Sequence, residues 1–320
     1  MIVVVPALFV LLAAPPADPA MASLRNEIIR IADEADGVVG VSVVHVPSGK
    51  SVSLRGGERF PMASVFKLPV AVAVLSRVDR RKMTLDEALP VVRGDLRPRG
   101  PLYERFKPGM TATVGQLLDD MMVESDGSSA DLLIRRLGGT KTVLDDLKAL
   151  GLKEIDVSLT ELQVSLFVSG VKDAPADLRM TPEQLKKRIS KVPPEAQRRA
   201  RTAFEKGAWN TATPEALSKL LGRLDKGELL SRPSTDRLLS AMRRCRTGDA
   251  RIRAGLPKGT EVLDKTGTIG RSTNDVGLVR LPGGSTLAIS VLILSSYVDE
   301  KAREDVIARI AGAAYKAFAR

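Results

Sequence analysis

The sequence predicts an α/β (α+β) fold: an antiparallel sheet built from both chain termini and flanked by helices, with an all-helical domain inserted between its two halves. Two observations carry this prediction. Strand-like patterns lie near both ends of the chain, whereas helix-start signals dominate the middle, from about residue 78 to 230. The expected strands are Val38–His45, Ser51–Leu54, Glu261–Asp264, Asp275–Arg280 and Ser285–Leu294, with P-G-G at 282–284 as a hairpin turn.

The expected helices follow from apolar spacing and capping residues. Residues 24–35 repeat apolar side chains at helical spacing, and a second helix should begin near Ser64. The T-P-E sequences at 181–183 and 213–215 each supply a capping hydroxyl, a proline at the first helical position and an acid in the first turn. A closing helix presents one apolar face made of Val306, Ile310, Ala314 and Phe318.

These elements suggest two domains with the active site between them. Residues 21–60 and 258–320 form the sheet domain, and residues 61–257 form the helical domain, which includes an extended insert at about 161–210. Residues 1–20 are expected to be a signal peptide, because the apolar run Ile2–Ala14 is short for a membrane span and A-M-A at 20–22 suits cleavage. We therefore expect a secreted or periplasmic protein with no transmembrane span in its mature form.

Composition narrows the possible functions. One cysteine, Cys245, allows no intrachain disulfide, and with one histidine, His45, it cannot supply a usual zinc ligand set, so we expect no metal and no cofactor. The net charge of +11 favours anionic partners in general. Aromatic residues make up only 3% of the chain, without an RNA-stacking pattern, so we expect no nucleic-acid binding.

The segment F-P-M-A-S-V-F-K at 60–67 places a nucleophile beside a base. Ser64 and Lys67 are three residues apart, so both lie on one face of a helical turn. A serine hydroxyl becomes a good nucleophile when a neighbouring base takes its proton, and a buried lysine can serve as that base. S-x-x-K alone is weak evidence, because a serine that caps a helix followed by an exposed lysine gives the same pattern.

Two further triplets strengthen the assignment. In Ser125-Asp126-Gly127, the serine can relay a proton to a leaving nitrogen, and in Lys265-Thr266-Gly267 the lysine and threonine can hold a substrate carboxylate. The backbone N–H groups of Ser64 and Thr268 would form an oxyanion hole. Each triplet alone also suits an ordinary turn, but the three together in this order indicate an acyl-transfer centre.

With these motifs the sequence resembles the class A serine β-lactamases, relatives of the penicillin-binding proteins. The similarity extends through T-G-D-A-R-I-R-A-G-L-P (247–257), D-K-T-G-T (264–268) and N-D-V (274–276), and covers most of the chain. The resemblance implies that Ser64 is acylated, Lys67 is its base or relay and Ser125 is the proton shuttle. It further implies a carboxylate site in which Arg251 supports Lys265, Thr266, Gly267 and Thr268.

The sequence departs from the family at the residues that release the acyl group. Glu161 stands where the family has a glutamate on its omega loop that activates water. Ser165 replaces an asparagine of that loop, and Asp131 replaces the asparagine that braces it. If Asp131 and Glu161 approach, their like charges would raise one pKa and weaken the base. Gly127, at a substrate-binding position, removes an amide that contacts the acylamino group of the substrate. Glu161 is therefore either the deacylating base or an exposed loop acid.

The insert of the omega-loop region is strongly basic. Residues 186–206 carry eight Lys and Arg against two Glu. A solvated basic helix face explains this pattern, and a weak contact with anionic cell wall or membrane, or a lid over the active site, is the sharper alternative. We expect a monomer.

The sequence therefore favours a serine β-lactamase that hydrolyses the β-lactam amide of a small-molecule substrate. The alternative is a DD-peptidase or transpeptidase-like acyltransferase that acts on peptidoglycan stem peptides and deacylates β-lactams slowly. A non-catalytic penicillin-binding or wall-binding sensor, or a polyanion-binding protein, is a third class, which would leave the Ser/Lys/Ser/Lys set unexplained.

Overall fold

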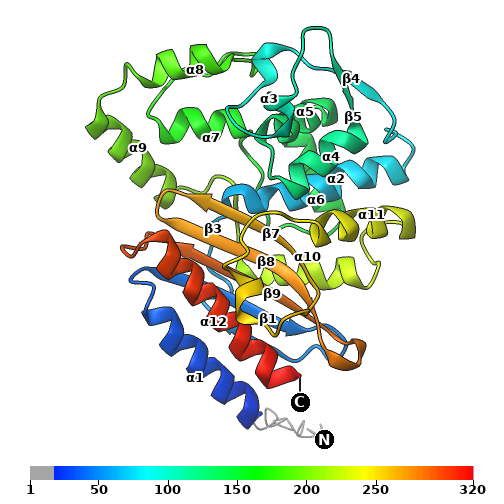
Figure 1. Ribbon diagram of the computed structural model, residues 1–320, viewed down its shortest axis with the longest axis vertical. Coiled ribbons are helices and arrows are strands. Elements are labelled where there is room, and N and C mark those ends of the chain that lie inside the picture. Colours follow the sequence, from blue (N-terminus) through cyan, green and yellow to red (C-terminus); the bar gives the residue numbers. More distant parts are fainter. Residues whose placement is uncertain (1–17, 320) are drawn as a thin grey trace, which may run out of the picture.

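The computed structural model describes residues 18–319. Its centre is a five-stranded antiparallel sheet in which the order β2-β1-β9-β8-β7 brings the two ends of the chain together (Figure 1). β1 pairs along its whole length with β9, so the sheet is built from both termini as predicted. The strands are β1 (Val38–His45), β2 (Ser51–Leu54), β7 (Val262–Ile269), β8 (Ser272–Arg280) and β9 (Thr286–Leu294).

Both faces of the sheet are covered by helices. α1 (Pro19–Asp33) and α12 (Glu300–Phe318) pack on one face, and α10 (Pro214–Asp225) packs on the other. Side chains of a strand alternate between its two faces. In β9 this alternation sends Leu287, Ile289, Val291 and Ile293 toward α1 and α12, whereas Ala288 and Leu292 join the core of the helical part. The predicted fold class is confirmed.

The helical part surrounds α2 (Lys67–Asp79), which is buried from Lys67 to Ser76, as expected of a helix that is apolar on all sides. In Figure 1 α8 and α9 form an outer arm, and α9 descends from it toward the sheet. The other helices are α3 (Pro101–Glu104), α4 (Val114–Val123), α5 (Gly127–Leu137), α6 (Thr140–Ala149), α7 (Glu161–Val168), α8 (Pro182–Ile189), α9 (Pro194–Lys206) and α11 (Arg232–Arg243).

Short elements that the sequence did not predict complete this part. The short strands form because they pair with segments far apart in the chain. A strand of two or three residues is too short to show a periodic pattern in the sequence. These elements are the strand pairs β3 (Phe60–Pro61) with β6 (Thr211–Ala212) and β4 (Ala88–Pro90) with β5 (Thr111–Thr113), and the 3₁₀ turns η2 (Arg93–Asp95) and η3 (Ile252–Gly255). The 3₁₀ turn η4 (Pro282–Gly284) lies at the predicted hairpin turn, and η1 (Ala63–Phe66) lies at the predicted helix start.

Several element boundaries differ from the predicted ones. The helix expected from Ser64 begins as the 3₁₀ turn η1 and becomes α-helical at Lys67. The strand expected to end at Asp264 continues to Ile269, so the K-T-G triplet lies inside β7 rather than after it. β8 likewise begins at Ser272 instead of Asp275. In both strands the hydrogen-bonded ladder continues through polar residues. These residues lack the alternation of apolar side chains by which a strand is recognised in the sequence.

The insert has its own small core and is attached at both sides. Its apolar cluster consists of Leu162, Leu166, Met180 and Leu185. Arg179 pairs with Asp95 at 3.1 Å, and Arg271 pairs with Glu205 of α9 at 2.8 Å. These contacts connect the insert to the 93–97 segment on one side and to the start of β8 on the other.

The amino-terminal predictions are tested only in part. Residues 1–17 of the expected signal peptide lie outside the described residues, and A-M-A at 20–22 lies in the first turns of α1. Within residues 18–319, every helix is too short or too polar to cross a bilayer. The division into domains at residues 60 and 258 stays a prediction.

Asn274 connects the sheet to η1. Its buried side-chain amide donates to the carbonyls of Pro61 and Met62 at 2.9 and 3.0 Å, and its oxygen accepts the N–H of Ile293 at 3.1 Å. A buried backbone group that loses a hydrogen-bond partner costs part or all of its desolvation free energy. The side chain of Asn274 therefore attaches the turn that carries Ser64 to β8, an inner strand of the sheet.

We expect Asn274→Ala to lower the free energy of unfolding by about 2–4 kcal/mol, because it leaves three buried backbone groups without this partner. Urea denaturation followed by circular dichroism measures the change. Asn26→Ala, at an exposed position of α1, is the matched control and should stay within about 0.5 kcal/mol of the parent. Equal stability of the two variants would contradict the role assigned to Asn274.

Candidate active site

Ser64 lies in η1, where β7 approaches so closely that one position requires glycine. A Cβ atom on Gly267 would stand 2.6 Å from the carbonyl oxygen of Met62 and 2.9 Å from the nitrogen of Ser64. Real Cβ atoms do not make such contacts, so only glycine lets the strand and the turn meet. Ala63, just before the serine, has a φ of +46°. Ser64 is thereby held in a tight turn against an edge strand of the sheet.

The side chain of Lys67 is 1% exposed, and its contacts are polar. Its Nζ donates to Ser64 Oγ at 3.0 Å, to the Ser125 carbonyl at 2.7 Å and to Ser125 Oγ at 3.3 Å. Glu161 Oε2 lies 3.3 Å from the same nitrogen. The ammonium therefore joins a candidate nucleophile, a candidate relay and a carboxylate.

Ser125 bridges the two lysines of the motifs. Its hydroxyl accepts a hydrogen bond from Lys265 Nζ at 3.0 Å, in addition to the contact from Lys67. Burial, and next the positive charge of Lys67, lower the pKa of Lys265 to about 8. Asp126 fixes the adjacent backbone, because its carboxylate caps α5 at Ser129 and accepts the N–H of Leu102. The structure thus brings together Ser64, Lys67, Ser125 and Lys265, which lie far apart in the sequence.

The remaining motif residues line the outer edge of β7. Thr268 is exposed, and its hydroxyl accepts a 2.7 Å hydrogen bond from Arg251. The Arg251 guanidinium is buried, lies 3.1 Å from Glu304 and donates to the Asn274 carbonyl at 3.0 Å, so it supports the strand from behind. Because β7 is an edge strand, alternate N–H groups are free of the ladder. The oxyanion role of the Thr268 N–H stays a prediction.

Glu161 is not an exposed loop acid. It is the first residue of α7, which Thr160 caps through Gln163, and its side chain is 26% exposed. The carboxylate reaches Lys67 at 3.3 Å, beside Ser64. This carboxylate is placed where it can act on a water near an ester formed at Ser64.

Gly127 leaves the space that Glu161 occupies. A Cβ atom at Gly127 would lie 2.7 Å from Glu161 Cγ and 3.2 Å from its Cδ. The sequence indicated only the loss of an amide at this position. The structure adds that residue 127 must lack a Cβ atom for Cγ and Cδ of Glu161 to occupy their positions.

Asp131 contacts the backbone at Glu161, so the pair does not meet carboxylate to carboxylate as the sequence suggested. The Asp131 carboxylate accepts the backbone N–H groups of Glu161 at 2.6 Å and Leu162 at 3.0 Å. Burial is the main cause that raises the pKa of Asp131, the Arg97 charge opposes it, and the Glu161 charge adds to it. The sequence analysis expected a raised pKa for one of the two carboxyl groups, and the pKa of Asp131 is raised.

Sequence reasoning missed three residues that support the site. Arg97 pairs with Asp131, Thr247 contacts the Thr266 hydroxyl at 2.5 Å, and Asn274 holds η1. A signal existed for the first of them, because an acid within A-D-L-L-I on a helix is a buried acid that needs a cation. Nothing local indicated which cation it would be.

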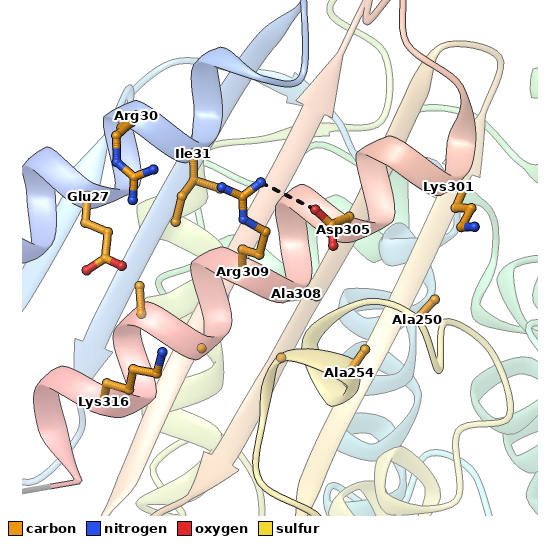
Figure 2. A pocket seen from close by; sticks show the side chains of 13 residues that line it. Glu27, Arg30, Ile31, Ala250, Ala254, Lys301, Asp305, Ala308, Arg309 and Lys316 are labelled. Carbon is orange, nitrogen blue, oxygen red and sulfur yellow. Dashed lines mark hydrogen bonds and ion pairs between the residues drawn. The ribbon is translucent and has the colours of Figure 1, made fainter.

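A separate hollow of about 470 Å³ lies between α1, α12 and the 250–255 segment (Figure 2). Arg309 crosses it and contacts Asp305 at 3.5 Å. Its other lining groups include Arg30, Lys301 and Lys316, and none of the predicted site residues borders it. The hollow is thus distinct from the site around Ser64.

Comparison with known proteins gives one consistent result. The family model described as "Beta-lactamase enzyme family" matches residues 23–318. β-Lactamase VEB-1 of Pseudomonas aeruginosa is 31% identical over 85% of this chain and 83% of its own length. A β-lactamase from Chitinophaga pinensis has a TM-score of 0.76 with 30% identity, covering 92% of this chain and 99% of that one. An ancestral class A β-lactamase has a TM-score of 0.75 with 30% identity and covers 92% of this chain and 100% of that one. This chain belongs to the class A serine β-lactamase family.

Proposed function

We propose that this protein is an enzyme that hydrolyses the β-lactam amide bond through an acyl-enzyme on Ser64, which water activated by Glu161 then releases. The observation that supports the proposal most strongly is the contact of the Glu161 carboxylate with Lys67 at 3.3 Å, a position from which a carboxylate can act on a water beside Ser64.

In acylation, Lys67 acts as base or relay: as Ser64 Oγ attacks the lactam carbonyl, the lysine takes the serine proton and gives one of its own to Ser125. The C–N bond then breaks, and Ser125, hydrogen-bonded to both lysines, delivers a proton to the leaving nitrogen. Lys265, Thr266 and Thr268, supported by Arg251, hold the substrate carboxylate.

In deacylation, Glu161 takes a proton from a water whose oxygen attacks the ester carbonyl. The ester C–O bond breaks, and the proton returns to Ser64 Oγ. The DD-peptidase alternative is not favoured, because the comparisons give β-lactamases and because Glu161 lies beside Lys67.

We further propose that the protein is exported, acts as a monomer and needs no cofactor. The basic side chains of residues 186–206 are exposed, which supports a weak contact with anionic cell wall or membrane. Such a contact would weaken as ionic strength rises, because salt screens exposed charges.

Glu161→Ala should trap the acyl-enzyme. With a chromogenic cephalosporin we expect one burst equivalent, then steady-state turnover at least about 100-fold slower than the parent, because the general base is gone. Intact-protein mass spectrometry should find the adduct on Ser64. Glu195→Ala, which removes an exposed acid of α9, is the control and should turn over normally. Normal turnover by the Glu161 variant would exclude it as the base.

The pKa of Lys265 should determine the pH above which the enzyme loses activity. Because it is lowered to about 8, the lysine loses its charge as pH rises through 8, and kcat/KM for a β-lactam carboxylate should fall by about tenfold per pH unit well above that value. Lys265→Arg keeps the charge at these pH values, since a guanidinium has a pKa above 12. The alkaline decrease should disappear in this variant, and its persistence would assign the decrease to another group.

Gly127→Ala should slow deacylation about tenfold, because the new Cβ displaces Glu161 Cγ from a 2.7 Å contact. Alanine favours a helix more than glycine does, so α5 should not be weakened. Deacylation rates of the acyl-enzyme measure the effect. Gly57→Ala, where the same atom meets nothing within 4 Å, is the control. Unchanged deacylation in the Gly127 variant would mean that the stem of Glu161 adjusts freely.

A further inference from the structure

Asp131 holds the beginning of α7. The first N–H groups of a helix have no partner inside it. Here Oδ1 of Asp131 accepts the N–H of Glu161 at 2.6 Å, and Oδ2 accepts the N–H of Leu162 at 3.0 Å. These are the first two residues of α7, so this one carboxylate holds the backbone at Glu161 directly.

Both oxygens of Asp131 accept these bonds best when the group is ionised, but Asp131 is only 5% exposed. A buried carboxylate is costly unless a cation pairs with it. Arg97, equally buried, donates from Nε to Asp131 Oδ2 at 3.0 Å, and its Nη2 lies 3.0 Å from the same oxygen. Arg97 therefore supplies the counter-charge.

Arg97 is itself held by three segments. Its Nη1 donates to the carbonyls of Leu96 at 2.9 Å and of Met180, in the insert, at 3.2 Å. Its backbone N–H donates to Ser128 Oγ of α5 at 2.8 Å. Arg97 is thus held to α5 by its backbone, and its guanidinium is held by carbonyls of the 94–97 segment and of the insert.

We propose that Arg97 is a positioning residue for deacylation: it neutralises the buried Asp131 carboxylate, which in turn holds the first turn of α7 and so keeps Glu161 beside Lys67. The inference rests on the proposed function, because it assigns the supporting contacts of the proposed base. Arg97 does not touch the reacting atoms.

The test measures acylation and deacylation separately, by stopped-flow acylation and by mass spectrometry of acylated Ser64 over time. Arg97→Met should slow deacylation at least about tenfold and leave acylation within about threefold, because Glu161 shifts while Ser64 and Lys67 stay. Arg97→Lys, which keeps the positive charge, should recover most of the loss. Arg93→Met, which removes a half-exposed arginine paired with Glu183 in the same segment, is the matched control and should behave as the parent.

A double-mutant cycle covers the case in which Arg97→Met does not fold. Asp131→Asn leaves the Arg97 cation buried without a counter-charge, and adding Arg97→Met removes it. We expect the double variant to deacylate at least about threefold faster than Asp131→Asn alone. Equal rates for these two variants, normal deacylation in a folded Arg97→Met variant, or an equal loss of both steps would overturn the proposal. Failure of the proposed function would instead appear in the parent protein, as absence of β-lactam turnover.

Discussion

The site depends on one buried cation. The Lys67 ammonium is enclosed by acceptors from three separate elements: the η1 turn, the segment before α5 and the start of α7. An ammonium buried without acceptors costs several kcal/mol, so these contacts are what makes the burial of this charge tolerable. The contacts that make its burial tolerable are also those that place Ser64, Ser125 and Glu161 around one atom.

A second layer of charge supports the first. Glu161 reaches Lys67 because α7 begins where Asp131 accepts its first N–H groups and because Gly127 leaves room for its stem. Asp131 is in turn acceptable inside the protein because Arg97 pairs with it. The insert joins this arrangement through Met180, whose carbonyl accepts from Arg97. The atypical omega region is thus part of the support of the site.

The sequence predicted the acylation half of the site better than the deacylation half. Ser64 and Lys67 are separated by one helical turn, a distance that backbone geometry alone determines. Asp131 and Arg97 lie 34 residues apart, and no local pattern selects one arginine from the 49 basic residues of the chain. The strand containing Lys265 was recognised but ended too early, because its polar residues continue the ladder without hydrophobic alternation.

By itself the sequence determined the fold class, the pairing of nucleophile and lysine, and the motifs that resemble the class A family, because these depend on short spacings and on strand and helix periodicities. Only the tertiary structure decided that Glu161 reaches Lys67, that Gly127 serves as clearance and that Arg97 is the counter-charge of Asp131. The physical reason is that burial and charge neutralisation are properties of contacts between distant segments. Such contacts exist only once the chain has folded.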